Sequence, residues 1–228
     1  MKLPFCVSWP PGFRGLNPHL PVRIYIRNLP HWRQAGATYF VTFRLADALP
    51  QQQLQFLKRL RDEWERTHPL PRSDADWEAF AQVETNAVER WSDEGYGDCW
   101  FRDVRWIGEL TDRLHHFHGR QHQLGGHVIM PNHCHLVIRP FDGHELEDIL
   151  QGVKSMTARA INRSRGESGS LWQEESYDRI VRDEEHLWRV VQYIGRNPRQ
   201  AGLAPEQWHR WINPDWQAAG WNFIDAPP

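Results

Sequence analysis

Hydrophobic positions along the chain alternate between the two-residue period of strands and the three-to-four-residue period of helices. The run from residue 37 to 45 (ATYFVTFRL) is rich in β-branched and aromatic residues and predicts a strand. Two further apolar runs, 123–131 and 134–140, meet at a Pro-Asn-His connection and predict two adjacent strands. We expect shorter extended segments after the glycines of EGYGDCWF and within residues 171–183.

Helical spacing recurs in five places. Pro50 opens a helix with one apolar face, formed by Leu54, Leu57, Leu60 and Trp64. Further helices are predicted over 74–93, over 104–119 with Gly119 as its C-cap, over 144–163, and over 184–197, where Pro198 ends the helix. Since strands and helices alternate and the central strand pair is hairpin-like, we predict an α/β (α+β) fold, with a mostly antiparallel central sheet flanked by helices.

The ends of the chain differ from its middle. Residues 1–28 are rich in Pro, Gly and Arg without a sustained period, and predict an extended or wrapping N-terminal arm. Residues 204–228 form a tail rich in Trp and Pro, which we expect to pack along the surface. A chain of 228 residues accommodates one domain with such appendages, and we place that domain at 29–203.

Composition narrows the function classes. With 40% apolar residues the chain can bury a core, and no uncharged run is long enough to span a bilayer. Three cysteines are too few for a disulfide scaffold, so we expect a cytoplasmic protein. The net charge of -2 argues against a bulk polycation, although residues 1–72 hold eleven basic and four acidic residues. The acid-free stretch 154–166 suits an anionic polymer, but equally an ordinary solvated helix face.

The most informative residues are His133 and His135, in the second strand of the predicted pair. Side chains two apart on a strand share a face, so both imidazoles point one way and Cys134 points to the opposite, apolar side. Two such imidazoles can hold one divalent metal, yet the spacing is as typical of two structural histidines. His116 and His118 have the same spacing but lie in a helical pattern, which sends their rings apart.

Tyr193 and Asn197 are four residues apart in the last predicted helix and therefore lie on one face. An amide oxygen is a hard ligand that could complete a shell for Mg²⁺ or Mn²⁺ with two histidines. Spacing alone favours a different interpretation, a buried tyrosine followed by a helix-terminating asparagine.

The segments MPNHCHLV, GSLWQEESYDRIVRDEEHL and YIGRNPRQAGL together resemble the single-tyrosine HUH transposases, and more closely the REP-associated tyrosine transposases of the IS200/IS605-like group. The resemblance runs from about Leu29 to Leu203. It implies an HUH-endonuclease-like (ferredoxin/RRM-like) core and metal-dependent cleavage and rejoining of single-stranded DNA. By position, His133 and His135 match the metal-ligand histidines, Tyr193 the nucleophile and Asn197 the third ligand. Tyr177 is the nearest rival nucleophile, but no ligand-type residue follows it by one turn.

The resemblance further implies Mg²⁺ or Mn²⁺ as cofactor, a 5′-phosphotyrosine intermediate, and single-stranded or hairpin-forming repeat DNA as substrate. Expected backbone contacts are Lys154, Arg159, Arg163 and Arg196. We expect a bacterial, nucleoid-associated protein without membrane contact, as a homodimer or a monomer. Two other functions stay open: a metal phosphodiesterase that uses water as nucleophile, and a non-catalytic reader of hairpin DNA.

Overall fold

A computed structural model describes residues 8–26 and 30–224. Its centre is a five-stranded antiparallel sheet in the order β6-β3-β5-β4-β7, which confirms the predicted fold class. The strands of this sheet are β3 (Tyr39–Arg44), β4 (His122–Ile129), β5 (His133–Pro140), β6 (Tyr177–Ile180) and β7 (His209–Ile212). The two strands with the longest buried runs, β4 and β5, are the adjacent pair predicted from the sequence.

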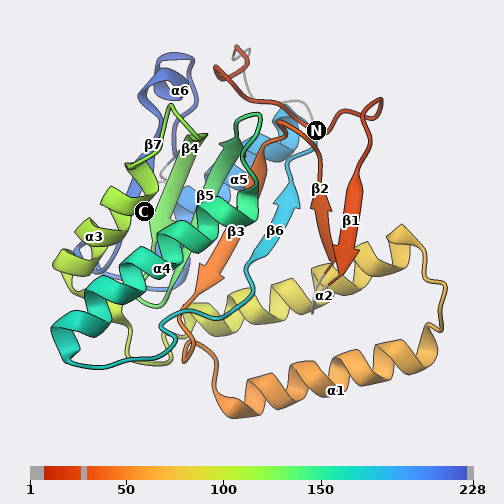
Figure 1. Cartoon of the computed structure of the whole chain (residues 1–228), viewed down its shortest axis with the longest axis horizontal. Coiled ribbons are helices and arrows are strands. Elements are labelled where there is room, and N and C mark those ends of the chain that lie inside the picture. The colour runs from red at the N-terminus through yellow and green to blue at the C-terminus, as the bar shows by residue number, and fades with distance from the viewer. Residues whose placement is uncertain (1–7, 27–29, 225–228) are drawn as a thin grey trace.

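Helices cover both faces of the sheet (Figure 1). The helices α3 (Val104–His115) and α4 (Leu146–Arg165) lie on one face, and α5 (Glu184–Gln200) lies on the other. Because side chains alternate along β5, Leu136 packs in the core beneath α3 and α4, whereas Val137 packs in a second core beneath α5. The sheet is therefore buried on both sides, and polar groups on its central strands are withdrawn from water.

A pair of long helices, α1 (Gln51–Thr67) and α2 (Asp74–Asp93), is inserted between β3 and α3 and extends below the sheet in Figure 1. Ser73 starts α2 with a reciprocal capping box. The Trp64 ring stacks on Phe80 at a centroid distance of 4.4 Å and joins the two helices. The bounds of α2 agree with the prediction, and residues of its C-terminal half line a cavity together with residues of α5.

Three local predictions are wrong. The segment after EGYGDC is a short 3-10 helix, η1 (Trp100–Arg102), because Cys99 adopts a left-handed conformation with φ 51° that breaks an extended path. The helix α3 ends at His115, so Gly119 does not cap it but turns the chain toward β4. Pro198 does not stop α5, which continues to Gln200. A proline in the last turn forfeits one helical hydrogen bond, and so few residues follow it that the turn survives.

The arm and the tail carry more structure than the sequence predicted. The arm contributes the strand β1 (Arg23–Ile26), which pairs antiparallel with β2 (Pro30–Arg33). The tail contains η2 (Pro205–Gln207), β7 and α6 (Pro214–Ala218). Trp216 and Trp221 are buried, and their indole N–H groups donate to carbonyls of the arm at 3.0 and 2.8 Å. The tail therefore completes the sheet and the core instead of only packing along the surface.

A bulge in β4 makes room for the tail. A Cβ on Gly125 would lie 2.1 Å from the Trp216 ring, so only glycine fits there. The proposed domain limits of 29–203 stay a prediction. Residues 1–7 of the predicted arm, its boundary at 28 and 29, and residues 225–228 of the tail lie outside the described residues. Within the described residues, no helix combines the length and apolar character needed to cross a membrane.

Candidate functional site

The strand β5 presents His133 and His135 on the face of the sheet that α5 covers. Both side chains are buried, and their ring centroids lie 4.7 Å apart. Cys134, between them, packs in the opposite core with α3 and α4, as the strand period predicted. The central position of β5, hydrogen-bonded to β3 and β4, fixes the backbone that carries the two imidazoles.

The helix α5 brings Tyr193 and Asn197 to the same place. The Tyr193 hydroxyl lies 3.4 Å from His135 Nε2, and the Tyr193 ring packs edge-on against the imidazole. Asn197, one helical turn later, is fully buried. The structure therefore brings Tyr193, rather than Tyr177, to the two histidines, and it places Asn197 in the core next to Tyr193 on the same helix.

Neighbouring polar groups orient the two imidazoles. Asn132 Nδ2 donates to the Tyr96 carbonyl at 3.0 Å, which leaves Asn132 Oδ1 to accept from His133 Nδ1 at 2.8 Å. The Nε2 of His133 is then the unprotonated nitrogen. His135 Nδ1 hydrogen-bonds the Thr42 hydroxyl at 2.7 Å, which directs its Nε2 toward Tyr193. Such outer partners are typical of histidines that bind metal ions.

Burial keeps both imidazoles neutral. Burial and, after it, the nearby Arg44 charge lower the pKa of His133 to about 3. The pKa of His135 is also far below its ordinary value, first because of burial and then because a protonated His135 would be repelled by a protonated His133 and by Arg44. A neutral imidazole offers a lone pair to a cation at any physiological pH.

Several buried polar atoms at this site have no hydrogen-bond partner. They are His133 Nε2, Asn197 Oδ1, Asn197 Nδ2 and Asp93 Oδ1. Leaving such an atom unpaired costs about 1–3 kcal/mol, so a cluster of them points to a missing ligand. Imidazole nitrogens and an amide oxygen together suit Mn²⁺ or Mg²⁺. The residues therefore fit the expected metal, with His133, His135 and Asn197 as the donor set.

A metal site built from these residues would depend on the amide of Asn197. No group of three or more His, Cys, Asp or Glu residues suited to a metal ion occurs in the described parts of the chain. Asp93 Oδ1 lies 3.7 Å from His133 Nε2, beyond hydrogen-bond distance.

Two acids from α2, which sequence reasoning did not assign to the site, face α5. Glu89 and Asp93 are one turn apart and line a cavity of about 470 Å³ together with Tyr193. Burial raises the pKa of Glu89 to about 7, reinforced by the Asp93 charge, and burial raises the pKa of Asp93 to about 6. The only signal in the sequence was the four-residue spacing of Glu89 and Asp93, which is equally typical of a solvent-exposed helix face.

Arg44 is the third group that was missed. It pairs with His133 across β3 and β5, and its Nε has no hydrogen-bond partner. Burial lowers the pKa of Arg44 to about 10, against the attraction of Glu89, Glu84 and Tyr193. A guanidinium remains charged at that value, so the site contains one cation beside neutral imidazoles. The sequence held a signal for this position, because Arg44 is two residues after Thr42 in one strand and the two side chains therefore share a face.

Tyr193 is difficult to ionise in this environment. Burial raises its pKa, and the charges of Glu89 and Asp93 raise it further. The hydroxyl is consequently protonated at neutral pH, and chemistry at its oxygen requires a proton acceptor.

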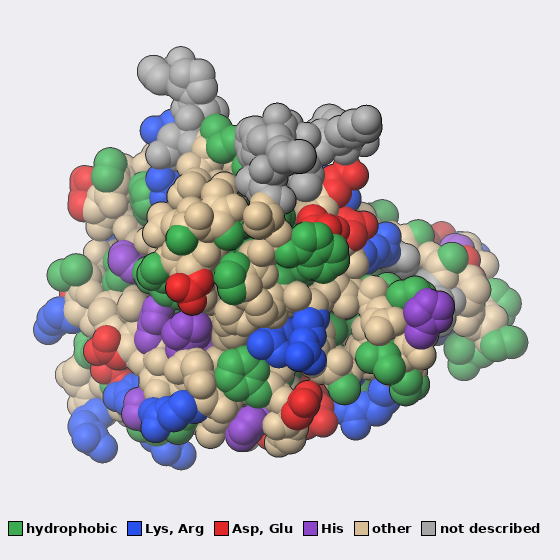
Figure 2. Space-filling view, turned by 90° about the horizontal axis from the view of Figure 1, so that it is seen from above, with side chains coloured by type: hydrophobic (Ala, Val, Ile, Leu, Met, Phe, Trp, Pro, Cys, Tyr) green, Lys and Arg blue, Asp and Glu red, His purple; other side chains and the backbone are tan. Residues whose placement is uncertain are grey.

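The four predicted DNA-contact residues are not gathered at the site. Lys154 Nζ donates to the carbonyls of Gln173 and Glu174 at 2.6 and 2.9 Å, so its ammonium is engaged within the protein. Arg159 and Arg163 are exposed on α4, which covers the opposite face of the sheet. Arg196 is exposed on α5, one turn after Tyr193. Figure 2 shows basic and acidic side chains interspersed on the face it presents, without a continuous basic surface.

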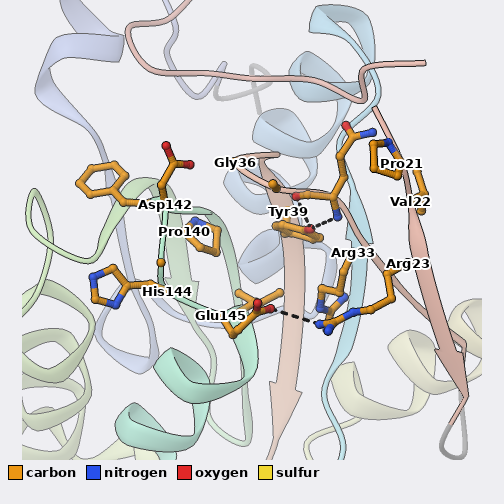
Figure 3. A pocket seen from close by; sticks show the side chains of 15 residues that line it. Pro21, Val22, Arg23, Arg33, Gly36, Tyr39, Pro140, Asp142, His144 and Glu145 are labelled. Carbon is orange, nitrogen blue, oxygen red and sulfur yellow. Dashed lines mark hydrogen bonds and ion pairs between the residues drawn. The ribbon is translucent and has the colours of Figure 1, made fainter. Parts of the chain in front are cut away.

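A separate cavity of about 510 Å³ lies between the arm and the turn after β5 (Figure 3). Arg23 Nη2 donates to Glu145 Oε2 at 3.3 Å across it. This cavity contains none of the predicted site residues.

Comparisons with known proteins bear on the same segment. Residues 114–197 match the family model described as "Transposase IS200 like", and this span runs from the end of α3 to Asn197. The resemblance to the IS200-like group is confirmed over that span, which contains both histidines and Tyr193. No curated protein matches the chain. One similar solved structure is described as a REP-associated tyrosine transposase bound to a REP hairpin. It is 16% identical, with a TM-score of 0.39, over 79% of this chain and 74% of that chain.

Proposed function

From the IS200-like transposase segment at residues 114–197, we propose that this protein cleaves and rejoins single-stranded DNA through a covalent 5′-phosphotyrosine on Tyr193. The observation that carries the proposal is the position of the Tyr193 hydroxyl, 3.4 Å from His135 Nε2 and beside the unpartnered atoms of His133 and Asn197. A hydroxyl next to an incomplete, buried donor set is the arrangement that phosphoryl transfer by a tyrosine requires.

Each residue has a role in the proposed reaction. His133, His135 and Asn197 hold Mg²⁺ or Mn²⁺, with Asn132 and Thr42 fixing the imidazoles. The bound metal supplies positive charge that offsets the charge of the scissile phosphate. The Tyr193 oxygen attacks phosphorus, an O–P bond forms, and the bond to the 3′-oxygen breaks. The covalent link conserves the phosphodiester energy, so a 3′-hydroxyl can reverse the step without ATP.

The substrate we propose is DNA whose repeats form hairpins with unpaired bases beside the cut. Unpaired bases let the phosphate reach a hydroxyl that lies in a cavity between helices. Arg196, exposed on the tyrosine helix, is the predicted cation best placed to contact the backbone near the cut. We propose that the protein acts in the cytoplasm, as a monomer or a homodimer.

Incubation with hairpin-bearing single-stranded DNA and Mn²⁺ tests the proposal. A denaturing gel should show a protein–DNA adduct, and Tyr193→Phe should abolish it. The matched control is Tyr177→Phe, which removes the rival hydroxyl and should leave the adduct. Cleavage without an adduct would replace the proposal with a metal phosphodiesterase, and binding without cleavage would replace it with a hairpin reader.

A further inference from the structure

The inserted helix α2 has a carboxyl group at the reacting oxygen. Glu89 and Tyr193 line the same cavity, and a hydrogen bond between the Glu89 carboxyl and the Tyr193 hydroxyl acts on the pKa of both groups. The other neighbours of that hydroxyl are worse proton acceptors. His135 Nε2 belongs to the proposed donor set for the metal, and a lone pair committed to a cation does not accept a proton.

We propose that Glu89 is the general base of the reaction and accepts the Tyr193 proton as the tyrosine oxygen attacks the phosphate. This inference rests on the proposed function and adds the catalytic group that it lacks. In cleavage, the Tyr193 O–H proton moves to Glu89 while the O–P bond forms, and the departing 3′-oxygen takes a proton from water. In rejoining, protonated Glu89 returns its proton to the tyrosine oxygen as that oxygen leaves, and the attacking 3′-hydroxyl loses its proton to water.

The groups around Glu89 suit a base that works near neutral pH. Four side chains act on it: Asp93 on its own helix, Arg44 on β3, Tyr193 on α5 and Arg179 on β6. Burial and Asp93 oppose the carboxylate, and the two arginines favour it, so its pKa is about 7. A base in this range is partly ionised at physiological pH and still basic enough to take a proton in the transition state.

A non-catalytic Glu89 predicts the opposite result on substitution. Its negative charge raises the pKa of Tyr193 and repels an incoming phosphate. If the carboxylate were only a neighbour, Glu89→Gln would ease ionisation of the phenol and speed adduct formation. If it is the base, the same substitution slows the reaction despite that electrostatic gain. The sign of the effect therefore separates the two roles.

The test measures single-turnover adduct formation on hairpin-bearing single-stranded DNA with saturating Mn²⁺, at pH values below and above 7. We expect the wild-type rate to rise with pH and level off above about 7, as Glu89 ionises. Glu89→Gln should be slower near neutral pH by about a hundredfold to ten-thousandfold. Its rate should keep rising about tenfold per pH unit above 7, because hydroxide then removes the phenol proton. The deficit consequently narrows with pH, whereas a structural defect would keep it constant.

Controls separate the base from the fold and from the metal. Glu65→Gln makes the same charge change on exposed α1 and should retain the wild-type rate and profile. Glu89→Asp keeps a carboxyl but withdraws it by one methylene, so it should be intermediate in rate and keep the plateau. A pH limb that shifts with Mn²⁺ concentration would belong to the metal ligands and overturn the assignment to Glu89.

The outcomes also distinguish this inference from the proposed function. No adduct with the wild type, or an adduct that survives Tyr193→Phe, rejects the proposed function itself. An adduct that needs Tyr193 but forms at the wild-type rate or faster in Glu89→Gln, with an unchanged pH profile, rejects only the role of Glu89.

Discussion

Two buried polar clusters lie on opposite faces of the sheet. The side chains of one complete each other's hydrogen bonds, whereas several polar atoms of the other have no hydrogen-bond partner. The arm cluster consists of His31, Arg33 and Asp178, and it joins β2 to β6. His31 Nδ1 donates to Asp178 Oδ2 at 2.7 Å, and Arg33 donates to both Asp178 oxygens. At the site of His133 and Asn197, by contrast, His133 Nε2 and both polar side-chain atoms of Asn197 have no hydrogen-bond partner.

The histidines of the two clusters also differ in their pKa, because one has acidic partners and the other has none within hydrogen-bond distance. Burial alone opposes the charge of His31, yet its hydrogen bonds to Asp178 and Glu175 raise its pKa to about 9. Burial with no compensating acid within hydrogen-bond distance instead lowers the pKa of His133 to about 3. Buried polar groups completed by their neighbours stabilise the fold, whereas a cluster of incomplete groups can be completed by a ligand.

The arm cluster should respond most strongly to loss of one member. Asp178→Asn leaves the buried Arg33 and His31 without their shared counter-charge and should lower the free energy of unfolding by about 3–5 kcal/mol. Urea denaturation at pH 7 measures the change. The control is Glu63→Gln, which breaks an exposed pair with Arg66 and should cost less than about 1 kcal/mol. An Asp178→Asn cost as small as the control would show that the cluster does not stabilise the fold.

The site should show the reverse behaviour, stability gained from a ligand. Mn²⁺ at a hundred times its dissociation constant should raise the free energy of unfolding by about 2.7 kcal/mol if it binds only the folded state. Asn197→Leu removes the unpartnered amide and fills similar space, so the metal-free protein should be no less stable. Mn²⁺ should then stabilise this variant much less. Equal stabilisation of the two proteins, measured by thermal unfolding, would remove Asn197 from the donor set.

The same contrast explains what the sequence could and could not predict. Alternation in β5 placed His133 and His135 on one face, and the helical period placed Asn197 beside Tyr193, because both periods are local properties of the chain. Glu89 and Arg44 were missed because their roles depend on how α2 and β3 pack against α5, which no local period encodes. The partners of Asp178 were missed for the same reason, since His31 and Arg33 precede it by more than 140 residues.

The proline and glycine errors have a different origin. Pro198 and Gly119 are strong local stop signals, and each was overridden by its position. Pro198 falls in the last turn of α5, where only one hydrogen bond is lost. Gly119 lies four residues beyond the end of α3, in a turn that requires its φ of 79°. Local rules therefore predicted the elements, and tertiary contacts decided where they ended.

Glu89 should have a smaller effect, which appears in how the free energy of unfolding depends on pH. Its folded-state pKa of about 7 is above the ordinary value of 4.5, so the folded protein binds more protons than the unfolded chain between these values. Stability attributable to Glu89 is therefore lost as pH rises through this window. Glu89→Gln removes the loss and should stabilise the metal-free protein above pH 7 by about 1–2 kcal/mol, with no gain below pH 4.5.

Thermal unfolding of the two proteins across this pH range measures the difference. Glu65→Gln, on the exposed side of α1, should show no such pH-dependent gain. A Glu89→Gln variant that is less stable than the wild type above pH 7 would mean that the carboxylate is satisfied in the folded protein. Glu89 would then resemble Asp178 of the arm cluster, whose charge is paired within the fold. A carboxylate that stabilises the fold when ionised is a weak proton acceptor, so this result would also count against Glu89 as the base.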